Sequence, residues 1–292
     1  MIKESLPIYQ IPDFDGAGFD SSVFYYSKLG RHLEKHKFIQ KPHKHDFYII
    51  LLITEGSGNH SIDFKEYEVS PGSVFFLHPG QVHSWQLSED SEGHILFFST
   101  EFYSFGFPTK NLSGFPFFAS SNHPCCLDLQ RDQRDEINSY FSEIEKETQG
   151  YGRSKKEVLR SYTEILLVKL DRIYQAVYGF GQNISPTENR LRALESVIEA
   201  HFRTDRHASF YADELNLSLK QLNRLTKISF GKTISELLLD RVILESQRLL
   251  TYSDDSVAEI AAQLGFEDPS YFSRLFRKKI GNTPEQFRRS VG

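Results

Sequence analysis

The last third of the chain carries one short pattern twice, fifty residues apart, and this repeat most constrains the possible folds. Leu222–Lys227 matches Phe272–Arg277, and the match continues from Gly231–Thr233 to Gly281–Thr283. Self-similarity at a fixed spacing indicates one supersecondary unit that is used twice. We therefore expect two related helical subdomains in this region.

Each copy has the local signals of two helices joined by a tight turn. In the second copy, Ser256 can cap a helix with Glu259 as its capping-box partner, and Gly265 can end that helix in the left-handed conformation. Asp268 then caps the next helix, and Pro269 lies in its first turn, where no backbone N–H is needed. That next helix has a polar, basic outer face, which is typical of a helix that enters a DNA major groove.

The outward positions of the two second helices supply the candidate DNA contacts. These residues are Lys220, Asn223, Arg224, Ser270, Ser273, Arg274, Arg277 and Lys278. Arginine can fork onto guanine and asparagine onto adenine, whereas we expect Arg277, Lys278 and Lys279 to meet phosphates. The alternative is that the arginines pair with a nearby carboxylate such as Asp213 or Glu214.

This region resembles the DNA-binding domain of the AraC/XylS family of bacterial transcription regulators. The residues that carry the resemblance are Ile260–Phe266, Tyr271–Lys278 and Gly281–Phe287. The resemblance implies a DNA-binding domain over residues 187–292, with helix-turn-helix motifs at about 208–229 and 256–279. It also implies a linker helix between them, over residues 234–250.

The N-terminal half alternates short apolar runs with Gly- and Pro-containing turns. The runs lie at residues 47–53, 60–64, 73–77 and 93–98, within a β-rich region of about residues 20–100. This pattern predicts an antiparallel sandwich or barrel. The region is similar to the cupin barrel that many AraC-type regulators carry, through Pro42–His45, Gly56–Gly58, Pro71–Gly72 and Pro79–Trp85.

The cupin resemblance implies a role for three histidines. His43, His45 and His83 would be ligands in a metal-binding cupin, but Ile49 and Ile50 stand where a glutamate usually completes the set. We therefore expect no metal and no cofactor. The alternatives are structural histidines at the barrel mouth, or a small-molecule pocket. If the site is a small-molecule pocket, the predicted effector-binding residues are His43, His45, Tyr48, His83 and Trp85.

Between the barrel and the repeat, the chain indicates a loop, two helices and a linker. Residues 102–124 are expected to form an irregular segment that either covers a ligand or packs on the following helices. Apolar stripes predict helices at 128–149 and 154–178. The family resemblance implies a homodimer through these helices, so we expect a charge at Leu166 to weaken self-association. Residues 179–186 are then the linker, and residues 1–178 form the effector-binding and dimerisation domain.

Composition sets the remaining limits. The net charge is −5, yet residues 187–292 hold sixteen Lys and Arg against fifteen Asp and Glu, so the acidic excess lies in the N-terminal part. The adjacent Cys125 and Cys126 give no disulfide framework. No apolar run reaches membrane-spanning length, and the N-terminus does not read as a signal peptide, so we expect a cytoplasmic protein without a membrane partner.

These patterns together indicate an α+β two-domain protein. It consists of a cupin-like antiparallel β-barrel with two following helices, and an all-α domain of two helix-turn-helix subdomains joined by a linker helix. We expect a ligand-responsive, sequence-specific regulator that binds double-stranded DNA and a small effector such as a sugar, and that contacts RNA polymerase. The alternatives are a metal-dependent cupin enzyme fused to a DNA-binding domain, and a regulator without an effector whose barrel only mediates dimerisation. We expect no enzymatic activity.

Overall fold

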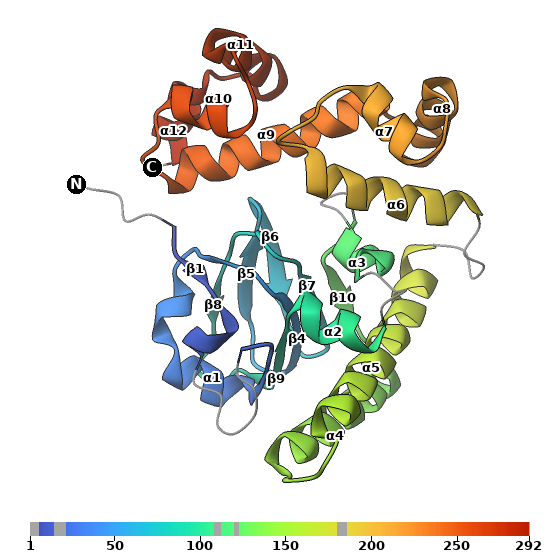
Figure 1. Cartoon of the computed structure of the whole chain (residues 1–292). Helices are drawn as coiled ribbons and strands as arrows, with labels where there is room; N and C mark the ends of the chain where they lie inside the picture. Colours follow the sequence, from blue (N-terminus) through green and yellow to red (C-terminus); the bar gives the residue numbers. More distant parts are fainter. Residues whose placement is uncertain (1–5, 15–21, 108–111, 120–122, 180–185, 292) are drawn as a thin grey trace. The chain divides into compact units, whose positions relative to one another are not determined.

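The computed structural model describes residues 6–14, 22–107, 112–119, 123–179 and 186–291. The chain divides into two compact units, Pro7–Asn183 and a second unit of Ile184–Gly292 with Met1–Leu6 (Figure 1). The first unit is built on antiparallel sheets with helices, and the second is all-α, so the predicted fold class is confirmed. In the described ranges, no helix has both the length and the apolar character needed to span a bilayer.

The N-terminal unit contains a five-stranded and a three-stranded antiparallel sheet. The larger sheet has the order β10 (Cys126–Asp128), β7 (Ser73–Leu77), β4 (Tyr48–Glu55), β9 (Glu92–Phe98) and β2 (Phe24–Lys28). The smaller sheet has the order β6 (Lys65–Val69), β5 (Gly58–Ile62) and β8 (His83–Leu87). The unit also contains a parallel pair, β1 (Ile8–Tyr9) and β3 (Lys44–His45), and the short helices η1 (Ile11–Asp13), α1 (Leu29–Lys35) and η2 (Lys37–Gln40).

The two faces of the larger sheet are both buried. Strand side chains alternate between faces, so Ile49 and Leu51 of β4 join a core shared with the smaller sheet, whereas Ile50 and Leu52 join a core under the helices. A strand that is buried on both faces has no polar alternation, which explains why β4 is a continuous apolar run.

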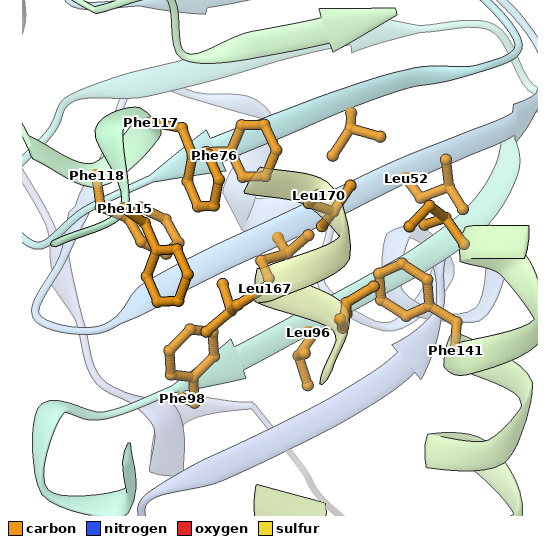
Figure 2. Close-up of a cluster of buried hydrophobic side chains, with 14 of the residues drawn as sticks. Leu52, Phe76, Leu96, Phe98, Phe115, Phe117, Phe118, Phe141, Leu167 and Leu170 are labelled. Atoms are coloured by element: carbon orange, nitrogen blue, oxygen red, sulfur yellow. The ribbon is translucent and has the colours of Figure 1, made fainter. Parts of the chain in front are cut away.

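Helices cover the outer face of this sheet. They are α2 (Thr100–Gly106), α3 (Pro116–Ala119), α4 (Arg131–Gln149) and α5 (Lys155–Tyr178). Figure 2 shows Leu167 and Leu170 of α5 packed among the sheet residues Phe76, Leu96 and Phe98. Helices α4 and α5 lie where the apolar stripes predict them, each beginning one to three residues later.

The Phe-rich segment 102–124 is part of this core. Phe115, Phe117 and Phe118 are buried, and the ring of Phe117 lies 4.0 Å from that of Phe76 and 5.5 Å from that of Tyr174 on α5. The interpretation that this segment packs against the following helices is therefore confirmed for its described residues. The segment is also more helical than expected, because α2 and α3 lie within or beside it.

The C-terminal unit contains helices α6 (Pro186–His201), α7 (Ala208–Glu214), α8 (Leu219–Phe230), α9 (Ile234–Tyr252), α10 (Val257–Gln263), α11 (Pro269–Ile280) and α12 (Pro284–Val291). Their apolar faces form a single core, to which the long helix α9 contributes from Ile234 to Leu250. The predicted linker helix is thus confirmed. Most of the predicted linker at 179–186 lies outside the described residues.

Candidate nucleic-acid interface and buried histidine cluster

Helices α8 and α11 are the second helices of the two helix-turn-helix motifs, and each is defined by local capping. Ser218 Oγ accepts a hydrogen bond from the Gln221 amide at 3.3 Å, and Asp268 Oδ1 accepts one from the Ser270 amide at 2.8 Å. Each helix ends at a glycine in the left-handed region. This residue is Gly231 after α8 and Gly281 after α11. These caps set both ends of each helix from adjacent residues alone.

The two helices have the same pattern of burial at equivalent positions. Residues 221–230 and 271–280 show the same sequence of buried, half-buried and exposed side chains. Leu222 and Phe272 point into the core, whereas Arg224 and Arg274 are exposed. The sequence repeat is therefore a structural repeat, with an arginine at the same outward position in both copies.

Six of the predicted DNA contacts are exposed on these helices. They are Lys220, Arg224, Ser270, Arg274, Arg277 and Lys278. Arg274 does have a carboxylate neighbour, with 3.6 Å between its Nη2 atom and Oδ2 of Asp268, not with the residues considered from sequence. An ion pair this long and this exposed binds its arginine weakly, so the guanidinium stays accessible to a base or a phosphate.

Asn223 and Lys279 are placed differently from the expectation. Asn223 is half-buried, and its Oδ1 atom accepts a hydrogen bond from the Ile234 amide of α9 at 3.2 Å. Lys279 Nζ lies 2.5 Å from Oδ1 of Asp240, which also pairs with Lys232 at 2.7 Å. Both side chains are therefore engaged by α9 and do not simply face solvent.

The N-terminal unit brings three of the predicted effector residues and one further histidine around Trp85. His43 and His83 have ring centroids 4.2 Å apart, and the His83 ring lies 5.1 Å from His45 and 5.2 Å from Trp85. His60 is not among the effector residues predicted from sequence; its ring lies 5.4 Å from that of Trp85, and its Nε2 shares a 3.0 Å hydrogen bond with His83 Nδ1. We call these five residues the histidine cluster.

Tyr48 does not belong to this cluster. It lies on β4 next to Phe47, and alternation turns it to the opposite face of the sheet. Its ring packs 5.7 Å from Phe98 and 4.8 Å from Phe118, in the core under the helices. The prediction that Tyr48 shares one effector pocket with His43, His45, His83 and Trp85 is therefore corrected.

The cluster histidines are buried and uncharged at neutral pH. Burial lowers the pKa of His43 to about 4 and that of His45 to about 3. The Nδ1 atoms of these two residues bond to the carbonyl oxygens of Lys41 and Phe47, at 2.8 and 2.7 Å, so each neutral ring carries its proton there. The Nε2 atom of each ring is then an acceptor.

Several polar atoms of the cluster have no hydrogen-bond partner among the described residues. They are Nε2 of His45, Nδ1 of His60, Nε2 of His83 and Nε1 of Trp85. Buried polar atoms are normally paired, so unpaired ones call for a bound molecule or water. In the described part of the chain, no group of three or more His, Cys, Asp or Glu side chains is arranged to hold a metal ion.

The cluster predicts an acid-sensitive N-terminal unit. Burial lowers the pKa of His60 to about 3, so below about pH 6.5 the unfolded chain binds a proton that the folded chain does not. This contribution is complete above pH 6.5 and is lost as the pH falls toward 3, at up to about 1.4 kcal/mol per pH unit. Between pH 6.5 and 4 the unfolding free energy falls with decreasing pH, and we expect His60→Phe to make this fall less steep. The difference in slope should correspond to about one fewer proton taken up on unfolding. Urea titrations at several pH values measure this slope, and an unchanged slope would contradict the assignment.

Comparison with known proteins gives matches to both units. A family model described as an AraC-like ligand binding domain matches residues 29–105, and one described as a helix-turn-helix domain matches residues 211–290. The HTH-type transcriptional activator RhaS of Escherichia fergusonii is 26% identical over 250 residues, which cover 84% of this chain and 86% of that protein.

Solved structures also match this chain. The C-terminal domain of the two-component response regulator yesN from Fusobacterium nucleatum is 32% identical, over 34% of this chain and 98% of that domain, with a TM-score of 0.33. An apo variant of ToxT from Vibrio cholerae is 16% identical, over 92% of this chain and 98% of that chain, with a TM-score of 0.40.

Proposed function

This chain belongs to the AraC family of helix-turn-helix regulators, and from that premise we propose that it binds a specific DNA sequence in response to a small hydroxylated molecule such as a sugar. The observation that carries the proposal is the structural repeat of α8 and α11, each with an exposed arginine at the same position. Two such helices can enter successive major grooves on one side of the duplex, about 34 Å apart.

The effector site we propose is the histidine cluster. Neutral imidazoles offer one donor and one acceptor each, which suits hydroxyl groups, and the aromatic face of Trp85 suits the apolar face of a sugar ring. The unpaired nitrogens of His45, His83 and Trp85 would be the hydrogen-bonding groups. Because these nitrogens are buried, the site should discriminate strongly between ligands. A ligand without the matching hydroxyl group would leave a buried nitrogen without a hydrogen bond.

We further propose a homodimer that acts with RNA polymerase. The support for the dimer is the exposed apolar residues Ile165 and Val177 on α5, which do not contribute to the unit's own core. A two-fold pairing of such helices is the simplest closed assembly. The support for a role with RNA polymerase is that the relative RhaS, named above, is a transcriptional activator.

Selection of bound sequences from a random DNA pool tests this function. The expected result is a motif with two separated contact regions, and a change in the strength of selection when the effector is present. Thermal-shift screening against sugars and small acids identifies candidate effectors, because a ligand that binds the folded state raises its stability. Failure of the pool to yield any preferred sequence at low ionic strength, with or without those ligands, would refute the proposal.

Arg274→Ala is expected to weaken binding to the selected sequence by about 1–3 kcal/mol and to leave binding to random DNA almost unchanged. The reason is that a forked contact to guanine is lost only where that guanine is present. Titrations on both kinds of DNA measure the difference. The matched control is Arg277→Ala with Lys278→Ala, which should weaken both and flatten the salt dependence. Equal losses for Arg274→Ala on both would make it a phosphate contact.

A further inference from the structure

Helix α8 is attached to the helix that follows it, α9, differently from the way α11 is attached to α12. One residue accounts for the difference. We propose that Asn223 is a positioning residue, which ties α8 to the start of α9, and not a reader of adenine. This inference rests on the proposed DNA-binding function of α8. It replaces the base-reading role that the sequence alone assigns to this asparagine.

The hydrogen bond that carries the inference satisfies a backbone group that has no other partner in its helix. The first amides of any helix lack an intrahelical acceptor. At the start of α9, Thr233 and Glu236 form a capping box, in which Thr233 Oγ1 accepts from the Glu236 amide at 3.3 Å and Glu236 Oε2 accepts from the Thr233 amide at 2.7 Å. The next amide, that of Ile234, donates instead to Asn223 Oδ1 at 3.2 Å.

The second repeat acts as an internal control. Its capping box is the same in form, with Thr283 Oγ1 accepting from the Gln286 amide at 3.2 Å. The residue equivalent to Ile234 is Pro284, which has no amide hydrogen. Ser273, the equivalent of Asn223, therefore has no amide at that position of α12 from which to accept. The first copy, whose following helix begins with an N–H donor, has an asparagine at this position. The second copy, whose following helix begins with proline, has a serine.

The bond also limits what Asn223 can do on DNA. Reading adenine requires the amide oxygen to accept from N6 while the amide nitrogen donates to N7. In this chain the oxygen faces Ile234, since the donor there is a backbone N–H and its partner must be an oxygen. Asn223 also lies half-buried between its helix and α9, whereas Arg224 next to it is exposed. Of the residues predicted to contact DNA in this motif, Lys220 and Arg224 remain as candidates for base selection.

Hydrogen exchange at the Ile234 amide of the full-length protein tests the proposal directly. Asn223→Ala should speed this exchange by about fivefold, the equivalent of one lost hydrogen bond. Asn223→Asp should keep the protection, because its carboxylate accepts the same bond and is favoured at a helix N-terminus. Ser273→Ala is the matched control in the second repeat, and we expect no change in exchange at the start of α12.

Selection from a random DNA pool separates positioning from reading. We expect Asn223→Ala and Asn223→Asp to select the same base pairs as the parent protein, with weaker selection for the alanine variant alone. If Asn223 instead reads adenine, both variants lose preference at one base pair, and the aspartate variant turns toward cytosine there. That outcome, or an unchanged exchange rate in Asn223→Ala, overturns the proposal. If the parent protein selects no sequence, the proposed function fails, while the exchange rates still decide whether Asn223 holds α9.

Discussion

Replacing Glu245 with alanine is expected to lower the free energy of unfolding of the C-terminal unit by about 3–5 kcal/mol. Glu245 on α9 is almost fully buried and accepts from Arg203 at 2.6 Å and from Arg241 and Arg248 at 3.1 Å each. Arg248 is only 4% exposed, so removing the carboxylate takes an ion-pair partner away from a buried guanidinium. Removing one partner from a buried ion cluster lowers the free energy of unfolding by far more than the intact cluster raises it.

The same cluster predicts how this unit responds to acid. Burial by itself would raise the pKa of Glu245, but the charges of Arg241, Arg248 and Arg203 outweigh it and hold the pKa at about 2. The folded state therefore binds its proton more weakly than the unfolded chain, so the contribution is complete above about pH 4.5 and is lost as the pH falls toward 2.

Denaturant titration at pH 7 and pH 3 measures both effects. Glu245→Ala should lose most at pH 7, and the gap between it and the parent protein should narrow at pH 3. Glu199→Ala is the matched control, since Glu199 accepts from Arg241 at 2.8 Å but is partly exposed, and we expect a smaller loss. A loss below about 1 kcal/mol for Glu245→Ala at pH 7 would mean that the arginines find other partners.

Leu166→Asp is expected to unfold the N-terminal unit, with a loss of more than about 4 kcal/mol. From sequence, Leu166 is expected at a subunit interface, and this is wrong: it is fully buried in the core that α5 forms with the five-stranded sheet. Aspartate there would replace a large apolar side chain with a carboxylate among the apolar residues of that core. Circular dichroism and urea titration measure the loss, and a variant that folds with near-parent stability would show that the site opens to solvent.

The neighbouring residue supplies the test of self-association. Ile165 is 40% exposed on the same helix, so Ile165→Asp should leave the fold intact. If the exposed face of α5 pairs with a second copy, this variant should shift the protein toward monomer in sedimentation measurements. A variant that remains as associated as the parent protein would place the interface elsewhere.

The two helix-turn-helix motifs and the linker helix of the C-terminal unit could be predicted from the sequence because their signals are local, whereas α6 and α12 were not predicted. Ser218, Ser256 and Asp268 cap helices as expected, and Gly231 ends its helix in the left-handed conformation. Caps, end glycines and a 3.6-residue period all act within one or two turns of chain. The fifty-residue repeat then relates the two motifs without any knowledge of their packing.

The N-terminal unit was predicted less completely because its strands depend on distant partners. In the three-stranded sheet, β6 and β8 were not identified, because β6 carries exposed charges at an edge and β8 opens with the polar residues His83 and Ser84. Each exists because it pairs with β5, and only that pairing brings His60 to His83. No signal within β5 marks His60 as a member of the histidine cluster.

The sequence by itself determined the two helix-turn-helix motifs, their outward arginines and the presence of an antiparallel N-terminal sheet, because these depend on periodicity and capping along short stretches. Only the tertiary structure decided which face each strand residue takes, which histidines meet, and that Leu166 lies inside its own unit. It also decided that Asn223 bonds to Ile234. These properties depend on contacts between residues far apart in the chain or on separate elements, and the burial of a side chain is a property of everything packed around it.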